Sequence, residues 1–240
     1  MSACVGVFET MGVVAGRIPL WRWHERRLLR GAARLGLPGP LPTDVATRLR
    51  ELAAGSGLED PIVRLTWTRD PEGAARFEMQ VRPRPNLRSV RLAVYPEPRV
   101  GRDELADVKH TARTFYDAAL AHASLVGADD AVILDSAGQV LETATANLFW
   151  MLDGEWRTPA AHGAFLPGIA RMLLLDALEA RGAPAREGHF DRAELADADE
   201  LVVVNAVHGP RAATLGADPV APLDSEHPLR RAWCGVLERG

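Results

Sequence analysis

The sequence predicts an α+β fold whose sheets are largely antiparallel. Helical and strand-like segments follow one another in a mixed order, and several strand-like runs are joined in pairs by tight turns such as Asp70-Pro71-Glu72-Gly73 and Asp153-Gly154. Strand pairs joined this closely favour antiparallel sheets over a doubly wound parallel sheet. At 240 residues, the chain is long enough for one large domain or two small ones.

The first part of the chain predicts two strands and two helices. Val5–Met11 and Val13–Pro19 are apolar and β-branched, so we expect two short strands joined by a glycine. A helix over residues 21–35 follows, because apolar residues recur there at helical spacing before a glycine and a proline. A second helix begins after Thr43 as its N-cap and ends near residues 55–57.

The remaining elements follow from the same periodicities. Further strands are predicted at Ile62–Thr68, Phe77–Arg82, Val90–Tyr95, Ala131–Leu134, through Leu141, at Asn147–Leu152, Glu155–Thr158 and Glu200–Val204. Further helices are predicted at Thr114–Leu125, Ile169–Ala180 and Asp191–Ala196. The proline and charge content of Pro96–Asp107 is typical of a connector, which we place at residues 97–107. We therefore expect a small N-terminal domain over residues 1–96 and a larger C-terminal domain over residues 108–240.

Composition and charge narrow the classes of partner. The formal net charge of -4 gives no electrostatic reason to expect nucleic acid or an anionic membrane as a partner. No run approaches the ~20 apolar residues that span a bilayer. Cys4 and Cys234 make neither a disulfide framework nor a metal cluster, so we expect no metal and a cytoplasmic location. A small molecule is the expected partner.

The basic residues are the most informative part of the composition. Of the 28 lysines and arginines, Lys109 is the one lysine. Codon preference or chance can leave a single lysine in an arginine-rich protein. A lysine amine, however, can be deprotonated and attack an aldehyde, whereas an arginine stays protonated. Lys109 is therefore the first candidate for covalent chemistry.

Several blocks of the sequence resemble the class IV aminotransferase family, the fold type IV pyridoxal-phosphate enzymes. The blocks are, in the order and spacing of the family, FETMGVVAGRIPLWRWHERRL, VKHTART, AVILDSAGQVLETATANLFW, RTPAAHGAFLPGIAR and ADELVVVNA. They cover most of the chain. The resemblance implies the fold of that family, in which a small N-terminal α/β domain joins a larger C-terminal domain with mainly antiparallel strands.

The resemblance also implies a set of cofactor contacts. Lys109 falls where the family places the lysine that binds the aldehyde of pyridoxal 5′-phosphate as a Schiff base and then moves the substrate proton. Glu142 falls where a carboxylate keeps the ring nitrogen protonated. His110 and His162 are interpreted as local hydrogen-bonding residues rather than catalysts.

The phosphate contacts come from three further segments. Arg27 matches the family's phosphate arginine, although it stands in a run with Arg22, Arg26 and Arg30 that would ordinarily be a solvated helix face. The amides of Gly168, Ile169 and Ala170 open a helix, where free N–H groups attract an anion. Asn205 ends a strand that lies near the phosphate in the family.

Within the family, the details resemble the 4-amino-4-deoxychorismate lyases, which form 4-aminobenzoate and pyruvate in folate synthesis. The details are Lys109-His110 with Arg113 four residues after the lysine, and the ANLFW block. Arg113 and Arg64 are the candidate contacts to substrate carboxylates. The alternatives are an amino-acid aminotransferase of branched-chain or D-amino acid type and a cofactor-binding relative without catalysis.

Two further expectations follow from the resemblance. We expect a homodimer acting on a small-molecule amine, because the family places its active sites beside a subunit interface and two-fold dimers are common. Family members generally begin well before the first shared block, whereas this sequence starts almost at it. The interpretations left open are a start placed too late, a more open pocket and a loss of activity.

Overall fold

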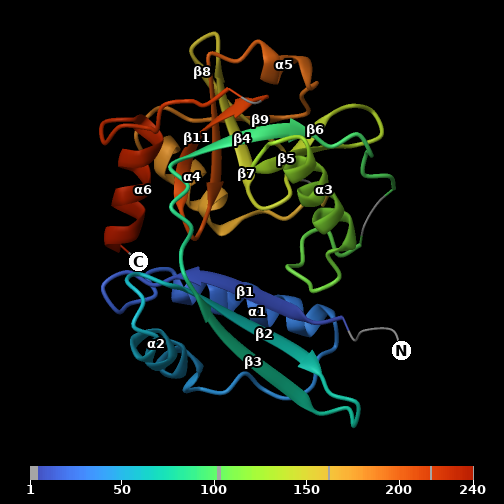
Figure 1. The fold of residues 1–240 in the computed structure, drawn as a ribbon, viewed down its shortest axis with the longest axis vertical. Coiled ribbons are helices and arrows are strands. Elements are labelled where there is room, and N and C mark those ends of the chain that lie inside the picture. Colours follow the sequence, from blue (N-terminus) through green and yellow to red (C-terminus); the bar gives the residue numbers. More distant parts are fainter. Residues whose placement is uncertain (1–4, 102–103, 162, 217, 240) are drawn as a thin grey trace. The chain divides into compact units, whose positions relative to one another are not determined.

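The computed structural model describes residues 5–101, 104–161, 163–216 and 218–239. Cys4, His162 and part of the predicted connector lie outside these ranges. The contacts divide the chain into two compact units. The smaller unit holds the residues up to Asn86 together with Val108–Arg113, and the larger unit holds Leu87–Asp107 and Thr114–Arg239. Each unit is described by itself (Figure 1).

The smaller unit is built on a three-stranded antiparallel sheet, in the order β1-β2-β3. Its elements are β1 (Val7–Gly12), α1 (Trp21–Arg34), α2 (Val45–Gly55), β2 (Ile62–Arg69) and β3 (Ala75–Arg82). The helix α1 packs on β1, and α2 packs on β2 and β3 (Figure 1). Along β2 the side chains of Val63, Leu65 and Trp67 are buried while those between them are partly exposed, as strand alternation requires.

Two predictions for this unit are wrong. Val13–Pro19 is not a strand, because Ala15 and Gly16 have positive φ of 48° and 72° and turn the chain back, so that Val14 pairs only with Arg17. Thr43 is not the N-cap of α2. Pro42 carbonyl accepts from Val45 N–H at 3.3 Å, which delays the helix by one residue, so Asp44 takes the cap position.

A distant segment completes the sheet of the smaller unit. Lys109 carbonyl accepts from Phe8 N–H at 3.0 Å, and Gly6 carbonyl accepts from Thr111 N–H at 2.8 Å. Thr111 Oγ1 accepts from Gly6 N–H at 2.9 Å, and Val7 and His110 form an antiparallel bridge. Residues 108–111 therefore lie antiparallel to β1 along the edge that β2 leaves open.

The larger unit is built on an eight-stranded sheet, in the order β6-β5-β4-β11-β10-β7-β8-β9. Three neighbouring pairs are parallel (β4 with β5, β4 with β11, β8 with β9), and the other pairs are antiparallel. The strands are β4 (Ser89–Val94), β5 (Asp130–Leu134), β6 (Val140–Thr143), β7 (Asn147–Leu152), β8 (Glu155–Pro159), β9 (Arg186–Gly188), β10 (Glu200–Asn205) and β11 (Gly209–Leu215). The helices are α3 (Thr114–Leu125), α4 (Ile169–Glu179), α5 (Ala193–Ala196) and α6 (Pro228–Arg239).

This arrangement confirms the predicted α+β class with mainly antiparallel strands. The helices and strands predicted from residue 62 onward are present with ends shifted by a few residues, whereas β9, β11 and α6 were not predicted. The predicted boundaries at residues 96 and 107 remain a prediction about domains. In the contacts, Ser89–Val94 pairs in the larger sheet and Val108–Arg113 belongs with the smaller unit. Within the described ranges, no helix is both long and apolar enough to cross a bilayer.

Gly209, the first residue of β11, packs against Trp233 of α6. Its φ is +68°, and a Cβ there would collide with the Trp233 indole. Gly182 has a similar φ of +71° but open space around it. Gly182→Ala should therefore lower the free energy of unfolding by about 1 kcal/mol from backbone strain alone, and Gly209→Ala by about 3 kcal/mol or more from strain and overpacking together.

Urea unfolding of both variants provides the measurement. Equal losses at the two positions would contradict the packing of Trp233 against Gly209.

Candidate active site

The residues predicted for the site fall into two groups, one in each unit. Arg27, Arg64, Lys109 and Arg113 belong to the smaller unit. Glu142, Gly168, Ile169, Ala170 and Asn205 belong to the larger unit. Each group is built by different elements, so the two are described in turn.

Lys109 lies in a cluster of cations around Phe8. Its Nζ is 4.7 Å from the centroid of the Phe8 ring, and the guanidinium carbons of Arg64 and Arg113 are 3.9 Å and 5.9 Å from the same centroid. Phe8 is buried, and a cation over its ring is attracted by the negative face of the ring. Three positive groups around one ring form a locus suited to an anionic ligand.

The strand register decides the orientation of Arg64. Phe8 pairs with Thr66 across β1 and β2, and Arg64 is two residues from Thr66 on the same strand. Alternation therefore puts Arg64 on the face of the sheet that carries Phe8. The buried Val63 and Leu65 point to the opposite face. Arg64 is thus brought together with Lys109, as a substrate contact would require.

Glu9, His24 and Arg27 form a buried polar cluster on that opposite face. Arg27 donates from Nε to Glu9 Oε1 and from Nη2 to Glu9 Oε2, both at 2.7 Å. His24 Nδ1 lies 2.6 Å from Glu9 Oε2. The exposed fractions are 1% for the Glu9 side chain, 2% for His24 and 9% for Arg27. Sequence reasoning found Arg27 but missed Glu9 and His24.

The charges of this cluster fix its protonation states. Burial alone would raise the pKa of Glu9, but the positive charge of Arg27, the adjacent His24 and their hydrogen bonds outweigh it and lower the pKa to about 2. Burial lowers the pKa of His24, against the opposing charge of Glu9. Since an ionised carboxylate only accepts hydrogen bonds, His24 Nδ1 is the donor to Glu9.

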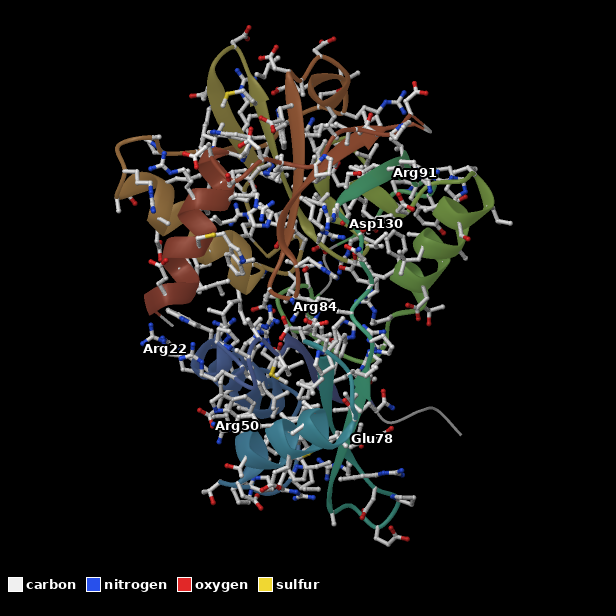
Figure 2. All side chains as sticks on the ribbon, turned by 60° about the vertical axis from the view of Figure 1, so that its left-hand side comes forward. Arg22, Arg50, Glu78, Arg84, Arg91 and Asp130 are labelled. Atoms are coloured by element: carbon white, nitrogen blue, oxygen red, sulfur yellow. The ribbon has the colours of Figure 1, made fainter. Side chains whose placement is uncertain are left out.

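Arg27 differs from the other arginines of α1. Arg22, Arg26 and Arg30 are exposed, whereas Arg27 is buried. Figure 2 labels Arg22, at the start of the helix. The charge run is therefore a solvated face with one member turned inward, and that member is the one selected by the family motif.

In the larger unit, Glu142 belongs to a chain of hydrogen bonds. Tyr116 donates from its hydroxyl to Glu142 Oε1 at 2.7 Å and accepts from Arg99 Nη1, which also lies 3.8 Å from Glu142 Oε1. Burial and the Glu142 charge raise the pKa of Tyr116, so the phenol stays protonated and remains a donor. Neither Tyr116 nor Arg99 was predicted, because their role depends on contacts distant in sequence.

Asn147 links Glu142 to the start of α4. Its Nδ2 donates to Leu166 carbonyl at 3.0 Å and lies 3.5 Å from Glu142 Oε2, while its Oδ1 accepts from Gly168 N–H at 3.1 Å. A Cβ at position 168 would collide with this amide. Gly168 is thus the N-cap of α4, followed by the first-turn amides of Ile169 and Ala170. An asparagine beginning the apolar run NLFW was the available signal.

Asn205 shapes the turn between β10 and β11. Its Oδ1 accepts from the N–H groups of Val207 at 3.2 Å and His208 at 3.0 Å. Its Nδ2 lies 3.4 Å from Thr145 carbonyl. Asn205 therefore has a structural role in the turn, and its contact with a phosphate remains a prediction.

The turn between Glu142 and Asn147 is held by a buried carboxylate. Thr143 and Thr145 donate from their hydroxyls to Asp130 Oδ2, at 2.8 Å and 2.5 Å. Asp130, labelled in Figure 2, lies at the start of β5, and burial raises its pKa against the hydrogen bonds that it accepts. This anchor fixes the two strands from which Glu142 and Asn147 project.

The ionised Glu9 makes the stability of the smaller unit depend on pH. A carboxylate whose pKa falls from 4.5 to about 2 on folding contributes stability above its unfolded pKa and loses it as the pH falls toward the folded value. We expect a loss on the order of 3 kcal/mol as the carboxyl is protonated, with neutral His24 adding to the loss below its own ordinary pKa.

Unfolding by denaturant at several values between pH 6 and pH 2.5 measures the effect. Glu9→Gln should flatten the acid branch of the profile, and the exposed Glu72→Gln should leave it unchanged. An acid branch of equal slope in Glu9→Gln and the unaltered protein would refute this assignment.

Comparisons with known proteins place this geometry in a family. The model of the family described as amino-transferase class IV matches residues 6–214. The aminodeoxychorismate lyase of Vibrio harveyi is 28% identical over 244 residues, which cover 92% of this chain and 83% of that protein. A probable branched-chain-amino-acid aminotransferase of Rickettsia felis is 26% identical, covering 75% of this chain and 67% of that protein.

A solved structure supports the same conclusion for the fold. The fold IV-transaminase CpuTA1 from Curtobacterium pusillum has a TM-score of 0.79 and 27% sequence identity, covering 98% of this chain and 84% of that chain. The two units, their sheets and the order of the elements are therefore those of fold type IV. On the family match over most of its length, the chain belongs to the class IV amino-transferase family.

Proposed function

We propose that this protein is a pyridoxal-phosphate enzyme that uses Lys109 as its covalent anchor and acts as a lyase on 4-amino-4-deoxychorismate. The observation that carries the proposal is the position of the single lysine. Lys109 is tied to β1 by backbone hydrogen bonds and presents its amine over Phe8, beside Arg64 and Arg113. Other members of the family fold have been solved with pyridoxal phosphate bound.

The described residues fit this cofactor. Lys109 supplies the amine for its aldehyde, and the buried carboxylate of Glu142 suits a protonated ring nitrogen. Gly168 lets the start of α4 approach Asn147 closely, because any Cβ there would strike its amide, and the first-turn amides of Ile169 and Ala170 are donors of the kind that bind phosphate. Arg27 adds a guanidinium, and Asn205 is the remaining proposed contact.

The chemistry divides between the cofactor and the protein. When bound, pyridoxal phosphate supplies an aldehyde and an electron-withdrawing ring. Lys109 would hold that aldehyde, and once the substrate amine had displaced it, its amine would be the base for the proton on the amine-bearing carbon of the substrate. Glu142 holds a proton on the ring nitrogen, while Tyr116 and Arg99 fix the carboxylate in place.

The similarity to a lyase and the cation cluster support the choice of substrate. Aminodeoxychorismate carries carboxylates, for which Arg64 and Arg113 provide guanidinium partners next to Lys109. The Vibrio harveyi lyase aligns with 92% of this chain, more than the Rickettsia felis aminotransferase does. The products would be 4-aminobenzoate and pyruvate.

An amino-acid aminotransferase is the second candidate. The similarity to CpuTA1 and to the branched-chain relative favours it, and the proposed cofactor contacts serve both reactions equally. A lyase needs one substrate, whereas an aminotransferase needs a keto acid to accept the amino group. We further expect a homodimer and a cytoplasmic location, which stay predictions.

The first test concerns the anchor. Purified protein reconstituted with pyridoxal phosphate should absorb above about 400 nm, which is a property of the cofactor when its imine with an amine is protonated. Borohydride should then fix the cofactor on the peptide that contains Lys109, identified by mass spectrometry. Lys109→Arg, which keeps the charge but not the nucleophile, should remain unlabelled.

A label on any other peptide, or no bound cofactor in the unaltered protein, would remove Lys109 from this role.

The second test concerns the reaction. Aminodeoxychorismate alone should give pyruvate and 4-aminobenzoate over many turnovers, because no amino-group acceptor is required. A panel of branched-chain and D-amino acids with 2-oxoglutarate or pyruvate serves as the comparison. Repeated turnover of an amino acid that strictly needs a keto acid, with none of aminodeoxychorismate, would replace the lyase by the aminotransferase and leave the cofactor assignment in place.

A further inference from the structure

Glu9 accepts hydrogen bonds from one edge of the Arg27 guanidinium, the edge formed by Nε and Nη2. A guanidinium has five N–H groups, one on Nε and two on each terminal nitrogen. The bonds to Glu9 use the Nε group and one group on Nη2. The other three N–H groups, on Nη1 and Nη2, take no part in this pair of bonds. They form a second fork, which has the spacing to receive two oxygens of another anion.

The remaining accessible surface of the cluster belongs to Arg27. Its side chain is 9% exposed, against 1% for Glu9 and 2% for His24. An anion that approaches the cluster therefore meets the Arg27 side chain before the carboxylate. The like charge of Glu9 is screened behind the residue that it orients.

His24 holds the carboxylate rather than the arginine. Its Nδ1 donates to Glu9 Oε2, the same oxygen that accepts from Arg27 Nη2. Glu9 thus has one oxygen bound once and the other bound twice, so its plane cannot rotate without breaking a bond. Since the guanidinium is coplanar with the carboxylate in a side-on pair, fixing Glu9 also fixes the direction of the second fork.

The charge balance gives the cluster a specific character. Glu9 cancels the charge of Arg27, and His24 is held neutral by burial, so the buried trio has no net charge. The titratable or charged groups that act on His24 are Glu9 from β1, Arg27 from α1 and Lys109 from the 108–111 segment. Attraction by excess positive charge therefore cannot be the main reason for an anion to bind at Arg27. Directed hydrogen bonds must supply the affinity.

We propose that Glu9 and His24 are positioning residues that aim the outer fork of Arg27 at the phosphate of the cofactor. The inference rests on the proposed pyridoxal-phosphate function and adds two residues that do not themselves touch the cofactor. A positioning role and a merely electrostatic role of Glu9 predict opposite effects on anion binding when the residue is replaced. Removing its negative charge would strengthen anion binding if charge alone mattered, and weakens it if orientation matters.

The experiment compares pyridoxal phosphate with pyridoxal, which has the same aldehyde and ring but no phosphate. Dissociation constants of both compounds are measured with apoprotein by absorbance. The Kd of pyridoxal divided by the Kd of pyridoxal phosphate gives the contribution of the phosphate to binding. The variants are Glu9→Gln, His24→Leu and His24→Asn, the last of which keeps a donor near the Nδ1 position. Arg26→Gln, on the exposed face of α1, is the control for general surface charge.

We expect Glu9→Gln and His24→Leu to lower the ratio about tenfold or more, as loss of outer-shell support does at other ligand sites. His24→Asn should stay within about threefold of the unaltered protein, and Arg26→Gln should match it. If Glu9 and His24 had a purely structural role, their replacement would weaken the binding of both compounds equally. An unchanged ratio would therefore overturn the proposal. A raised ratio in Glu9→Gln also overturns it, in favour of the electrostatic role.

A second measurement covers the case in which a variant does not fold. In the unaltered protein, the Nε–H signal of Arg27 and the ring signals of His24 should shift on addition of pyridoxal phosphate and not of pyridoxal. Equal responses to the two compounds overturn the proposal. If the unaltered protein binds pyridoxal phosphate with an unperturbed cluster, only this inference fails. If it binds neither compound, the proposed function fails as well.

Discussion

The backbone hydrogen bonds between residues 109–111 and β1 are the constraint on which the candidate site depends. They close a stretch of about a hundred residues and add the lysine-bearing segment to the sheet of the smaller unit. The edge of β1 is satisfied in this way instead of being left for another chain to pair with. Because the pairing sets alternation as well as distance, it also decides that Lys109 shares a face with Phe8 and Arg64.

The charged side chains on the two faces of this sheet are arranged differently. On the face toward α1, Glu9 neutralises Arg27 at close range, which is what burial of an arginine demands. On the face of Phe8, three cations surround one ring, an arrangement that a sequence selected for stability alone would avoid. The first arrangement suits a fixed binding element. The second gathers cationic groups of the kind that bind an anionic ligand.

Much of the fold could be predicted from the sequence, because its elements carry their periodicity locally. The helices α1 and α3 and the strand pair β7–β8 are examples. The strand β11 was missed because its sequence GPRAATL holds few β-branched residues and is made a strand by its neighbours β4 and β10. The expected strand after Gly12 failed for the opposite reason, since two positive φ values overrode its β propensity.

Candidate site residues could be named from the sequence where a residue type or the family resemblance points to them, and not where a role lies in a contact. Lys109 stands out as the one lysine and Glu142 follows from the resemblance; their contacts with a cofactor remain a prediction. Glu9, Tyr116 and Asn147 could not, because each acts on a partner brought near by folding. The sequence therefore offers candidate contacts, and the structure adds the residues that hold those candidates in place.

We propose above that Lys109 anchors pyridoxal phosphate and that Glu142 keeps the ring nitrogen of the cofactor protonated. The most direct test is the nitrogen NMR shift of pyridoxal phosphate labelled with ¹⁵N in its ring and fixed on Lys109 with borohydride. We expect a protonated ring nitrogen in the unaltered protein and in the exposed control Glu97→Gln, and an unprotonated one in Glu142→Gln, because a neutral amide no longer favours the proton. The same protonation state in Glu142→Gln and the unaltered protein would contradict it.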